Sequence, residues 1–465
     1  MTPEELLQFA RDNAVEYVDL RYTDFAGKCH HITIPVDQLG LADFEQGWGR
    51  GRPALCGNHL LTPVPTTAFL DPFCQHTTLS LLCETMDPAT GDACPDDPRG
   101  IANRAQTFLE STGVADQALF ALAPEFYIFD QVSFEQTTNG AHYHVDSREG
   151  IWRQGHDDPD NLGTQIPASQ GESGLPPFDS LHNLRAEMAA ALAACGVKGV
   201  AHRHGAGPGQ GVLELPRAGL VAAADQFALC KYVVRNVAAR HGKVATFMAQ
   251  PLFGDAGSAL HLRFSLTRAN QCVLTGNQPG GLSDVGLWAV GGLLSHALSL
   301  MALHCPTTNS YRRKFPEREL PYSLAYVCDN PGALVGLYHG ETSPATEWIG
   351  FRATDGTCNP YLAISALVLA ALDGIEQHSD PGSLYDLRDR TLAPSLASLQ
   401  TPPQLLHQSL DAVLRALQQD HKYLLRGGVL TPALVEHWRI QSLARGELPL
   451  RARPHPYEFC LYFDA

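Results

Sequence analysis

Alternation of apolar and polar residues predicts a small strand-rich unit at the start of the chain. Residues 15–22 alternate, Gly27 marks a turn, and residues 31–34 resume the alternation, as in a β-hairpin. Thr2 precedes a proline and two glutamates, which predicts that it is the N-cap of a first helix. A further short strand is expected over residues 77–82. These elements indicate a mixed α/β unit, and we place a domain boundary near residue 100.

Longer helical patterns follow this boundary. Residues 181–195 place apolar side chains on one stripe, and residues 221–241 repeat the pattern. Gly196 and Gly242 follow these segments, and glycine is common at the ends of helices. Strands over 211–215 and 252–266 and an apolar helix over 360–375 are also expected.

Two other segments have less regular patterns. Residues 285–303 carry no Asp, Glu, Lys or Arg, but their glycines and serines favour a buried core helix over a membrane span. Residues 145–177 are rich in Gly, Asp, Gln and Ser, and their weak periodicity predicts a long surface loop or flap.

Composition and charge narrow the class of protein. A chain of 465 residues with 44% hydrophobic composition can bury a large core in two or more domains. Its formal charge of -16 argues against nucleic acid or an anionic membrane as a partner, because both carry negative charge. The twelve cysteines include no C-x-x-C pair, and no signal peptide opens the chain. We therefore expect reduced thiols and a cytoplasmic protein.

Several blocks in order resemble one known family, the type I glutamine synthetases. The blocks are residues 25–35, 123–130, 231–238, 245–255, 307–313 and 359–362. The resemblance implies an α+β fold, with a small N-terminal β-grasp domain over residues 1–100 and a large catalytic-type domain over residues 101–465. The large domain would contain a curved antiparallel sheet and helices. The family assembles as two stacked hexameric rings, which would make this chain part of a dodecamer.

The family's reaction phosphorylates the side-chain carboxylate of glutamate with ATP and then lets ammonia displace the phosphate. This chemistry needs divalent metals, arginines that hold the phosphoryl group, and a base. Compared with the family, this sequence has lost many of these groups.

Most positions of the family's metal ligands have changed. Ala123 replaces one carboxylate of a pair in which only Glu125 remains, and Gly350 replaces the last ligand. The resemblance leaves as metal candidates Glu125, Glu214 after a small insertion, His261, and His204 if the gap is placed earlier. We expect at most one divalent metal, Mg, Mn or Zn. A rebuilt zinc site that includes these histidines is an alternative to plain inheritance of the histidines.

The phosphate contacts and the base are also missing. Pro331, Gly336 and Trp348 stand where the family has arginines, and none of them offers a charged planar fork to a phosphate. The loop over residues 47–66 has no Asp or Glu to act as the base. These losses argue against ATP turnover.

The amino-acid end of the site is better kept. Matched substrate-binding residues are Glu125, Gly257, His261, Arg313 and Arg352, and Glu319 matches the acidic residue of the closing flap, which is a catalytic candidate. From spacing alone, the default interpretation of Arg313 and Arg352 is that they are solvated or structural arginines, and only their position in the matched motifs favours a ligand role.

Three hypotheses follow. In the first, the protein is a pseudoenzyme that binds glutamate or a similar amino acid without ligation, as a sensor, a regulatory subunit or an enzyme of changed mechanism. In the second, it is an ATP-dependent γ-glutamyl ligase that joins glutamate to ammonia or an unusual amine. In the third, it assembles with a true glutamine synthetase paralogue, because residues 455–463 resemble the family's intersubunit strap.

Overall fold

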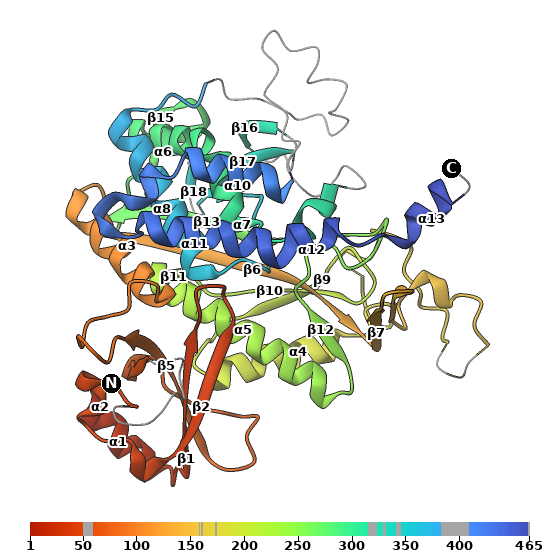
Figure 1. The fold of residues 1–465 in the computed structure, drawn as a ribbon, viewed down its shortest axis with the longest axis horizontal. Coiled ribbons are helices and arrows are strands. Elements are labelled where there is room, and N and C mark those ends of the chain that lie inside the picture. The colour runs from red at the N-terminus through yellow and green to blue at the C-terminus, as the bar shows by residue number, and fades with distance from the viewer. Residues whose placement is uncertain are drawn as a thin grey trace.

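The chain contains two β-sheet units that are joined along the helix-rich side of the larger one (Figure 1). The computed structural model describes residues 1–49, 59–157, 159, 161–172, 174–314, 323–328, 332–340, 346–382 and 409–463. The elements of the first unit are α1 (Pro3–Asp12), β1 (Tyr17–Thr23), β2 (Cys29–Pro35), α2 (Asp43–Gln46), β3 (Leu60–Pro63), β4 (Phe69–Leu70) and β5 (Thr78–Met86).

The hairpin and the first helix of this unit agree with the sequence pattern. β1 and β2 are antiparallel, and Gly27 takes the positive φ of +86° that the turn between them requires. Thr2 caps α1 in a capping box with Glu5. The strand order is β2-β1-β5-β3, with β5 parallel to β1. The inward-facing side chains of the strands and of α1 form a separate small core.

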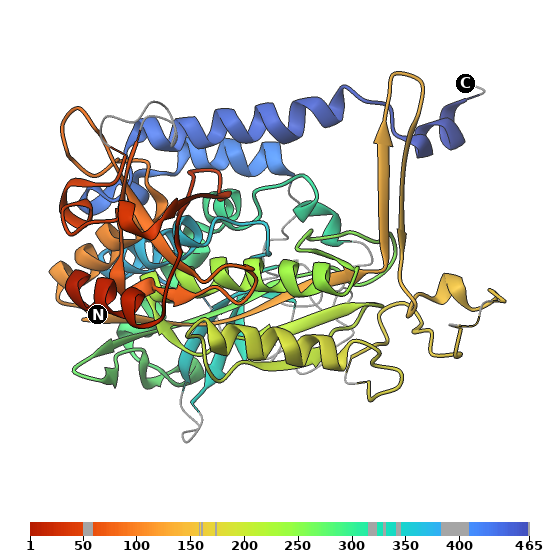
Figure 2. The same cartoon turned by 90° about the horizontal axis from the view of Figure 1, so that it is seen from below.

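The large unit is built on a sheet with the order β16-β17-β18-β13-β6-β10-β9, to which shorter strands add. Its strands are β6 (Gln117–Phe129), β9 (Ala201–His204), β10 (Gln210–Glu214), β11 (Ala218–Gly219), β12 (Val244–Thr246), β13 (Leu260–Arg268), β14 (Gln271–Cys272), β16 (Ser323–Cys328), β17 (Ala333–His339) and β18 (Thr346–Phe351). The pairs are antiparallel except β16 with β17. A separate hairpin of β7 (Gln131–Gln136) and β8 (Ala141–Asp146) projects at the same end of the molecule as the C-terminus (Figure 2).

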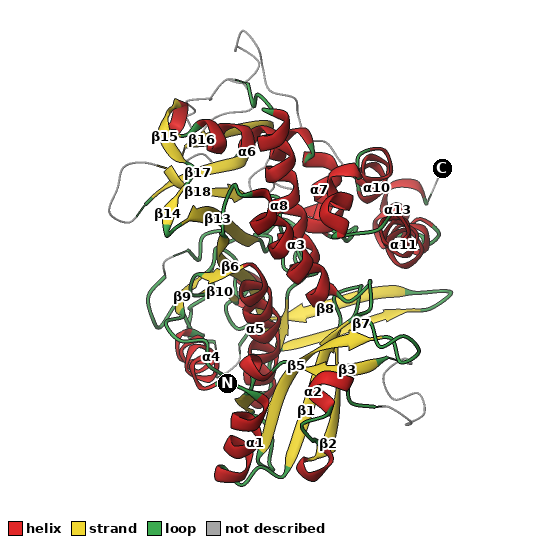
Figure 3. Cartoon of the chain, turned by 90° about the vertical axis from the view of Figure 1, so that its left-hand side faces the viewer, coloured by secondary structure: helices red, strands yellow, loops and turns green. Residues whose placement is uncertain are grey.

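Helices cover this sheet and supply most of the main core. They are α3 (Pro98–Thr112), α4 (His182–Ala194), α5 (Leu220–Arg240), α6 (Asp284–Ser295), α7 (Ala297–His304), α8 (Pro360–Gln377), α10 (Leu410–Gln419), α11 (Pro432–Ser442), α12 (Leu448–Arg451) and α13 (Pro456–Tyr462). α8 is almost entirely buried and lies beside α3 on one side of the sheet (Figure 3). Gly292 of α6 allows close packing on α8, because a Cβ there would lie 2.2 Å from the Ala370 carbonyl oxygen.

Short helical segments complete the described elements. They are the 3₁₀ helices Val36–Gln38, Pro65–Thr67, Ile151–Arg153, Pro279–Gly281, Ser310–Lys314 and Lys422–Gly428, and the π-helix Leu443–Glu447. One further short strand is β15 (Thr275–Gln278).

The uncharged segment over residues 285–303 forms two helices and not one. α6 and α7 meet at His296 with a bend of 73°. The bend lets the His296 ring hydrogen-bond to Asp373 and Asp420, at 3.1 and 2.9 Å. Within the described residues, no single helix is long and apolar enough to cross a membrane, and this bent pair passes that test only when its two parts are taken together.

Two other sequence expectations need correction. The strand expected over 252–266 begins only at Leu260, because residues 253–257 form a turn that contains Gly254 at φ +74°. The segment expected to be a surface loop over 145–177 carries the fully buried Glu149, so part of it belongs to the interior.

Candidate functional site

The register of the large sheet brings some of the candidate residues, among them Glu125 and His261, onto one face. Side chains alternate along each strand, so residues that are directly opposite one another share a face. Cross-strand partners connect the face from β9 to β17: Arg203 with Val212, Val212 with Glu125, Ala123 with His261, Arg263 with Gly350, and Gly350 with Gly336. We call this surface the strand face.

Glu125 and His261 form the centre of the strand face. His261 Nε2 lies 2.9 Å from Glu125 Oε1, and the Ala259 N–H donates to Oε2 at 2.8 Å. Burial opposes the ionisation of Glu125, but the charge and hydrogen bond of His261, the Ala259 N–H and the charge of Arg203 outweigh it and hold the pKa of the carboxyl below its usual value. Glu125 is therefore an ionised carboxylate that can bind a cation or an ammonium group.

Glu214 does not join this pair. Val212, and not Glu214, lies opposite Glu125, while Glu214 lies two residues further along β10, opposite Ala201. Glu214 is exposed and is paired with Arg203 Nε at 3.8 Å. The metal role that the resemblance implies for Glu214, after a small insertion, stays a prediction.

His204 lies on the opposite side of β9 and belongs to another cluster. Its Nε2 is 3.0 Å from Glu149 Oε2, and both side chains are buried. Burial alone would favour the neutral ring, but the hydrogen bond and charge of Glu149 raise the pKa of His204 above its ordinary 6.5. The structure thus separates His204 from Glu125 and His261.

Glu149, Asp179 and His204 form a group whose ligand atoms lie within 4.8 Å of one another, a spacing that could hold a metal ion. Both oxygens of Glu149 already accept hydrogen bonds, from Ser180 and from the N–H of Gly209 as well as from His204. Asp179 is paired with the buried Arg185 at 2.5 Å. These donors occupy both oxygens of Glu149 and one oxygen of Asp179, but Asp179 Oδ1 is buried without a hydrogen-bond partner, so the group is a buried ion-pair network that leaves one carboxylate oxygen open to a metal ion.

Two glycines show how the strand face has been rebuilt. Gly336 and Gly350 are direct partners on β17 and β18. A Cβ at Gly336 would lie 2.5 Å from the Arg352 guanidinium, and a Cβ at Gly350 would lie 2.7 Å from the Tyr338 ring. Arg352 and Tyr338 thus fill the space above the two glycines, and Arg352 Nε donates to the Tyr338 hydroxyl at 3.1 Å.

Other arginines lie around this rebuilt region. The Arg263 guanidinium lies 3.9 Å from the centroid of the Tyr338 ring, and the Arg217 guanidinium lies 5.0 Å from the centroid of Trp348. Arg217 and Arg263 are exposed, whereas Trp348 is buried. Positive charge therefore remains beside the positions at which the family resemblance showed lost arginines.

Arg313 is buried beneath the site. Its guanidinium donates to the carbonyl oxygens of Ser258 and Thr354, at 3.3 and 3.1 Å, and lies 3.9 Å from Asp355. It therefore stabilises the loops that flank β13 and β18. Its predicted contact with a substrate carboxylate stays a prediction.

Of the remaining predicted site residues, Gly257 is described by the structure and others are not. Gly257 is buried, and its carbonyl oxygen accepts a hydrogen bond from Gln210 at 2.8 Å. Glu319, Pro331 and part of the loop over residues 47–66 lie outside the described residues, so the proposed flap acid and the missing base stay predictions.

Comparison with known proteins shows the family to which this chain belongs. Residues 95–462 match the family described as glutamine synthetase, catalytic domain. The chain belongs to the glutamine synthetase family. A glutamine synthetase from Aquifex aeolicus is 40% identical over 472 residues, which cover 100% of this chain and 99% of that protein. One from Microchaete diplosiphon is 37% identical with the same coverage.

Solved structures confirm the α+β glutamine synthetase fold. The Plasmodium falciparum glutamine synthetase, determined by cryo-electron microscopy, superposes with a TM-score of 0.87 and covers 99% of both chains at 22% identity. A structure of GmaS with ADP superposes with a TM-score of 0.80 at 23% identity and full coverage. At these identities the likeness concerns the fold alone.

The similarity to glutamine synthetases supports a ligase-type protein and gives no support to the pseudoenzyme hypothesis. The family normally uses divalent metals and ATP. On the strand face, Glu125 and His261 fit one cation, because Mg²⁺ is often bound by one or two carboxylates together with substrate phosphates and water. They do not supply the ligands of two protein-held metals.

Sequence reasoning missed residues that lie near Glu125, Gly336 and Gly350 on the strand face. Arg203, Arg263 and Tyr338 did not stand out, because the sequence alone does not show which neighbour fills the space left by a glycine. One signal was present: Gly336 and Gly350 both lie in apolar strand segments, where glycine often marks a close approach.

Proposed function

We propose that this protein is an ATP-dependent ligase that joins glutamate, or an amino acid of similar shape, to ammonia or another amine. The observation that carries the proposal is full-length similarity to two glutamine synthetases, at 40% and 37% identity, combined with the Glu125–His261 pair at the centre of the strand face. Binding of ATP and of one divalent metal is part of this proposal.

The side chains of the strand face can do what such a ligation needs. Ionised Glu125 would hold a cation, and that cation would neutralise phosphate oxygens. Arg263 and Arg217 are exposed and offer planar, permanently charged forks for phosphate or carboxylate oxygens. The γ-carboxylate would attack the terminal phosphorus of ATP and release ADP, and the amine would then displace phosphate.

A second function is favoured by one observation, namely that Tyr338 and Arg352 fill the space above Gly336 and Gly350. If this packing persists with substrates present, the protein binds the amino acid without phosphorylating it. In this alternative it would act as a sensor or a regulatory subunit.

An assay of ADP formation separates the two functions. Full-length protein is incubated with ATP, magnesium, glutamate and a panel of amines that includes ammonia. We expect ADP formation that requires both glutamate and one amine, and a rate loss of at least about tenfold in Glu125→Gln, a typical cost for losing a metal-site residue. Glu110→Gln, an exposed carboxylate on α3, is the matched control and should keep the rate.

One result of this assay would contradict the ligase proposal. Saturable glutamate binding by calorimetry, with no ADP formed from any amine, would support the second function and overturn the first.

We propose assembly into stacked hexameric rings, with this chain alone or with a true glutamine synthetase paralogue. α13 exposes apolar side chains in the described structure and extends away from the body of the molecule (Figure 2). These side chains are Tyr457, Phe459, Leu461, Tyr462 and Phe463. Native mass spectrometry of protein expressed with and without a paralogue tests both forms. The cytoplasmic location stays a prediction from the sequence.

A further inference from the structure

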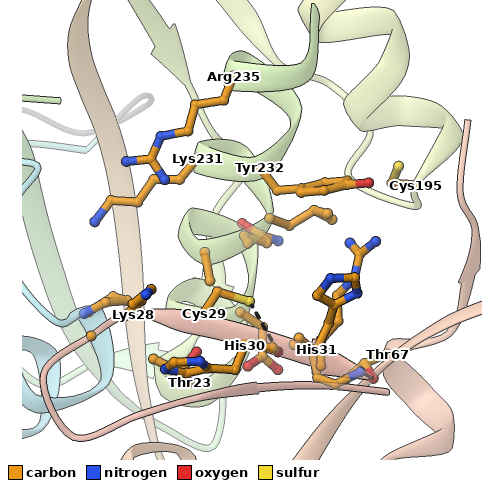
Figure 4. Close-up of a pocket in the computed structure, with 18 of the residues that line it drawn as sticks. Thr23, Lys28, Cys29, His30, His31, Thr67, Cys195, Lys231, Tyr232 and Arg235 are labelled. Carbon is orange, nitrogen blue, oxygen red and sulfur yellow. Dashed lines mark hydrogen bonds between the residues drawn. The ribbon is translucent and has the colours of Figure 1, made fainter. Parts of the chain in front are cut away.

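A cavity lies between the two units, away from the strand face. It has a volume of about 940 Å³ and is bounded by the β1–β2 hairpin on one side and by α5 on the other (Figure 4). This volume is in the range of cavities that hold small organic ligands. The cavity is open to solvent through exposed residues of the hairpin, among them Lys28 and Cys29.

Three cations line the cavity without a carboxylate partner. Lys231 and Arg235 are one turn apart on α5, and Lys28 lies on the hairpin across from them (Figure 4). Lys231 Nζ lies 3.3 Å from the Cys358 carbonyl oxygen, which is neutral. Among the residues that the structure describes, none of the three forms an ion pair. In a protein with a formal charge of -16, such an unbalanced group of cations is unusual.

The carboxylates in the cavity wall are already neutralised by other partners. Asp19 is paired with Arg21 at 2.6 Å and with His31 at 2.7 Å. Asp225 is paired with Arg99 at 3.1 Å. These acids therefore compensate other cations, and neither of them is paired with Lys28, Lys231 or Arg235.

Burial strengthens the case for an anionic occupant. Removal from water is the main cause that lowers the pKa of the half-buried Lys231, whereas Lys28 and Arg235 are exposed. A bound anion would offset this cost, because opposite charges attract more strongly where water is scarce.

The wall of the cavity is held in place by backbone contacts between the units. Asn359, which caps α8, donates to the Phe25 carbonyl oxygen at 3.2 Å, and a Cβ at Gly27 would lie 3.1 Å from the Asn359 Cβ. The hairpin that carries Lys28 is thus fixed against the start of α8. This contact fixes the backbone that carries Lys28 relative to the large unit, which reduces the cost of bringing the cations around a ligand.

We propose that this cavity binds a small organic anion through a phosphate or carboxylate group held by Lys28, Lys231 and Arg235. The site is separate from the proposed ligase chemistry, so an occupant there could couple the N-terminal unit to the catalytic unit.

Protection of a thiol in the cavity tests the proposal. Cys29 lines the cavity and is exposed, whereas the exposed Cys460 lies on α13. Full-length protein is alkylated with neutral iodoacetamide in inorganic phosphate, in succinate, or in potassium chloride of equal ionic strength, and the Cys29 and Cys460 peptides are quantified by mass spectrometry. Phosphate or succinate should slow alkylation of Cys29 but not of Cys460, by about tenfold at ten times the dissociation constant.

Variants assign the effect to the cations. Arg235→Gln should abolish the protection, and Lys198→Gln, an exposed lysine outside the cavity wall, should keep it. Calorimetric titration of the same proteins with phosphate and succinate gives a second readout that does not depend on Cys29. The phosphate and succinate arms distinguish the two ligand groups.

The proposal is overturned if neither anion protects Cys29 and neither gives binding heat beyond the chloride control. It is also overturned if Arg235→Gln leaves the protection and the heat unchanged. Equal protection of Cys29 and Cys460 would also overturn it. None of these readouts requires ligase activity, so the outcome is independent of the ADP assay.

Discussion

At the scale of single residues, two glycines leave space on the strand face that larger neighbouring side chains fill. Gly336 and Gly350 stand where the family resemblance implies an arginine and a metal ligand, and Arg352 and Tyr338 occupy the space that they leave. The absence of these two groups is what the family resemblance in the sequence implies. Their replacement could not be predicted from the sequence, because it depends on strand register and on the side chains of residues two positions away.

Gly350→Ala should destabilise the protein by about 1–3 kcal/mol, the usual cost of overpacking. The added methyl group would lie 2.7 Å from Tyr338 and 3.3 Å from the Leu262 carbonyl oxygen. Urea unfolding measures the change. The control Gly155→Ala adds a methyl group in open space and should have little effect, so equal destabilisation of the two variants would contradict this account.

His204 and Glu149 should make stability depend on pH. Because folding raises the pKa of His204, its contribution is complete below 6.5 and is lost as the pH rises through the raised pKa. His204→Gln keeps a hydrogen-bond donor without the charge and should cost about 3 kcal/mol at about pH 5.5 and clearly less at about pH 9. The free energy of unfolding of both proteins at the two pH values checks this.

At pH 5.5 the lowered pKa of Glu149 keeps that carboxyl ionised, so the acid partner does not change over this range. A cost of His204→Gln that is equal at both pH values would show that the pair is not an imidazolium–carboxylate pair.

At the scale of elements, periodicity predicted helices well and strand limits less well. α5 and the first hairpin agree with the patterns to within about two residues, which is the usual uncertainty of element ends. The bend between α6 and α7 was missed because His296 looks like one polar residue in an apolar stretch, and its two carboxylate partners lie far away in sequence. Buried Glu149 was missed for the same reason.

Asn359 links the two units and should contribute more to the free energy of unfolding than an ordinary helix cap does. It accepts a hydrogen bond from the Tyr361 N–H and donates to the Phe25 carbonyl oxygen, both at 3.2 Å. Asn359→Ala should cost about 2–3 kcal/mol, because it removes a cap and leaves a buried acceptor unpaired. Ser409→Ala, at the exposed cap of α10, should cost about 1 kcal/mol in the same urea titration. Equal costs would show that Asn359 is only a cap.

At the scale of the whole molecule, the α+β fold and its family followed from motifs spread along the chain, and the comparisons confirmed both. The missing ligands pointed towards a pseudoenzyme, whereas full-length similarity supports a ligase. The difference arises because a sequence shows lost groups more readily than it shows the arginines that now surround the site. The domain limits and the ring assembly stay predictions.

The most direct test of the ligase proposal follows one oxygen atom. Glutamate labelled with ¹⁸O in its γ-carboxylate is incubated with full-length protein, magnesium, ATP and the amine that supports ADP formation, and the inorganic phosphate is analysed by mass spectrometry. If the carboxylate attacks ATP and the amine then displaces phosphate, one ¹⁸O atom moves into the phosphate for each amide formed. Phosphate without label, or no phosphate although glutamate binds, would contradict the proposal.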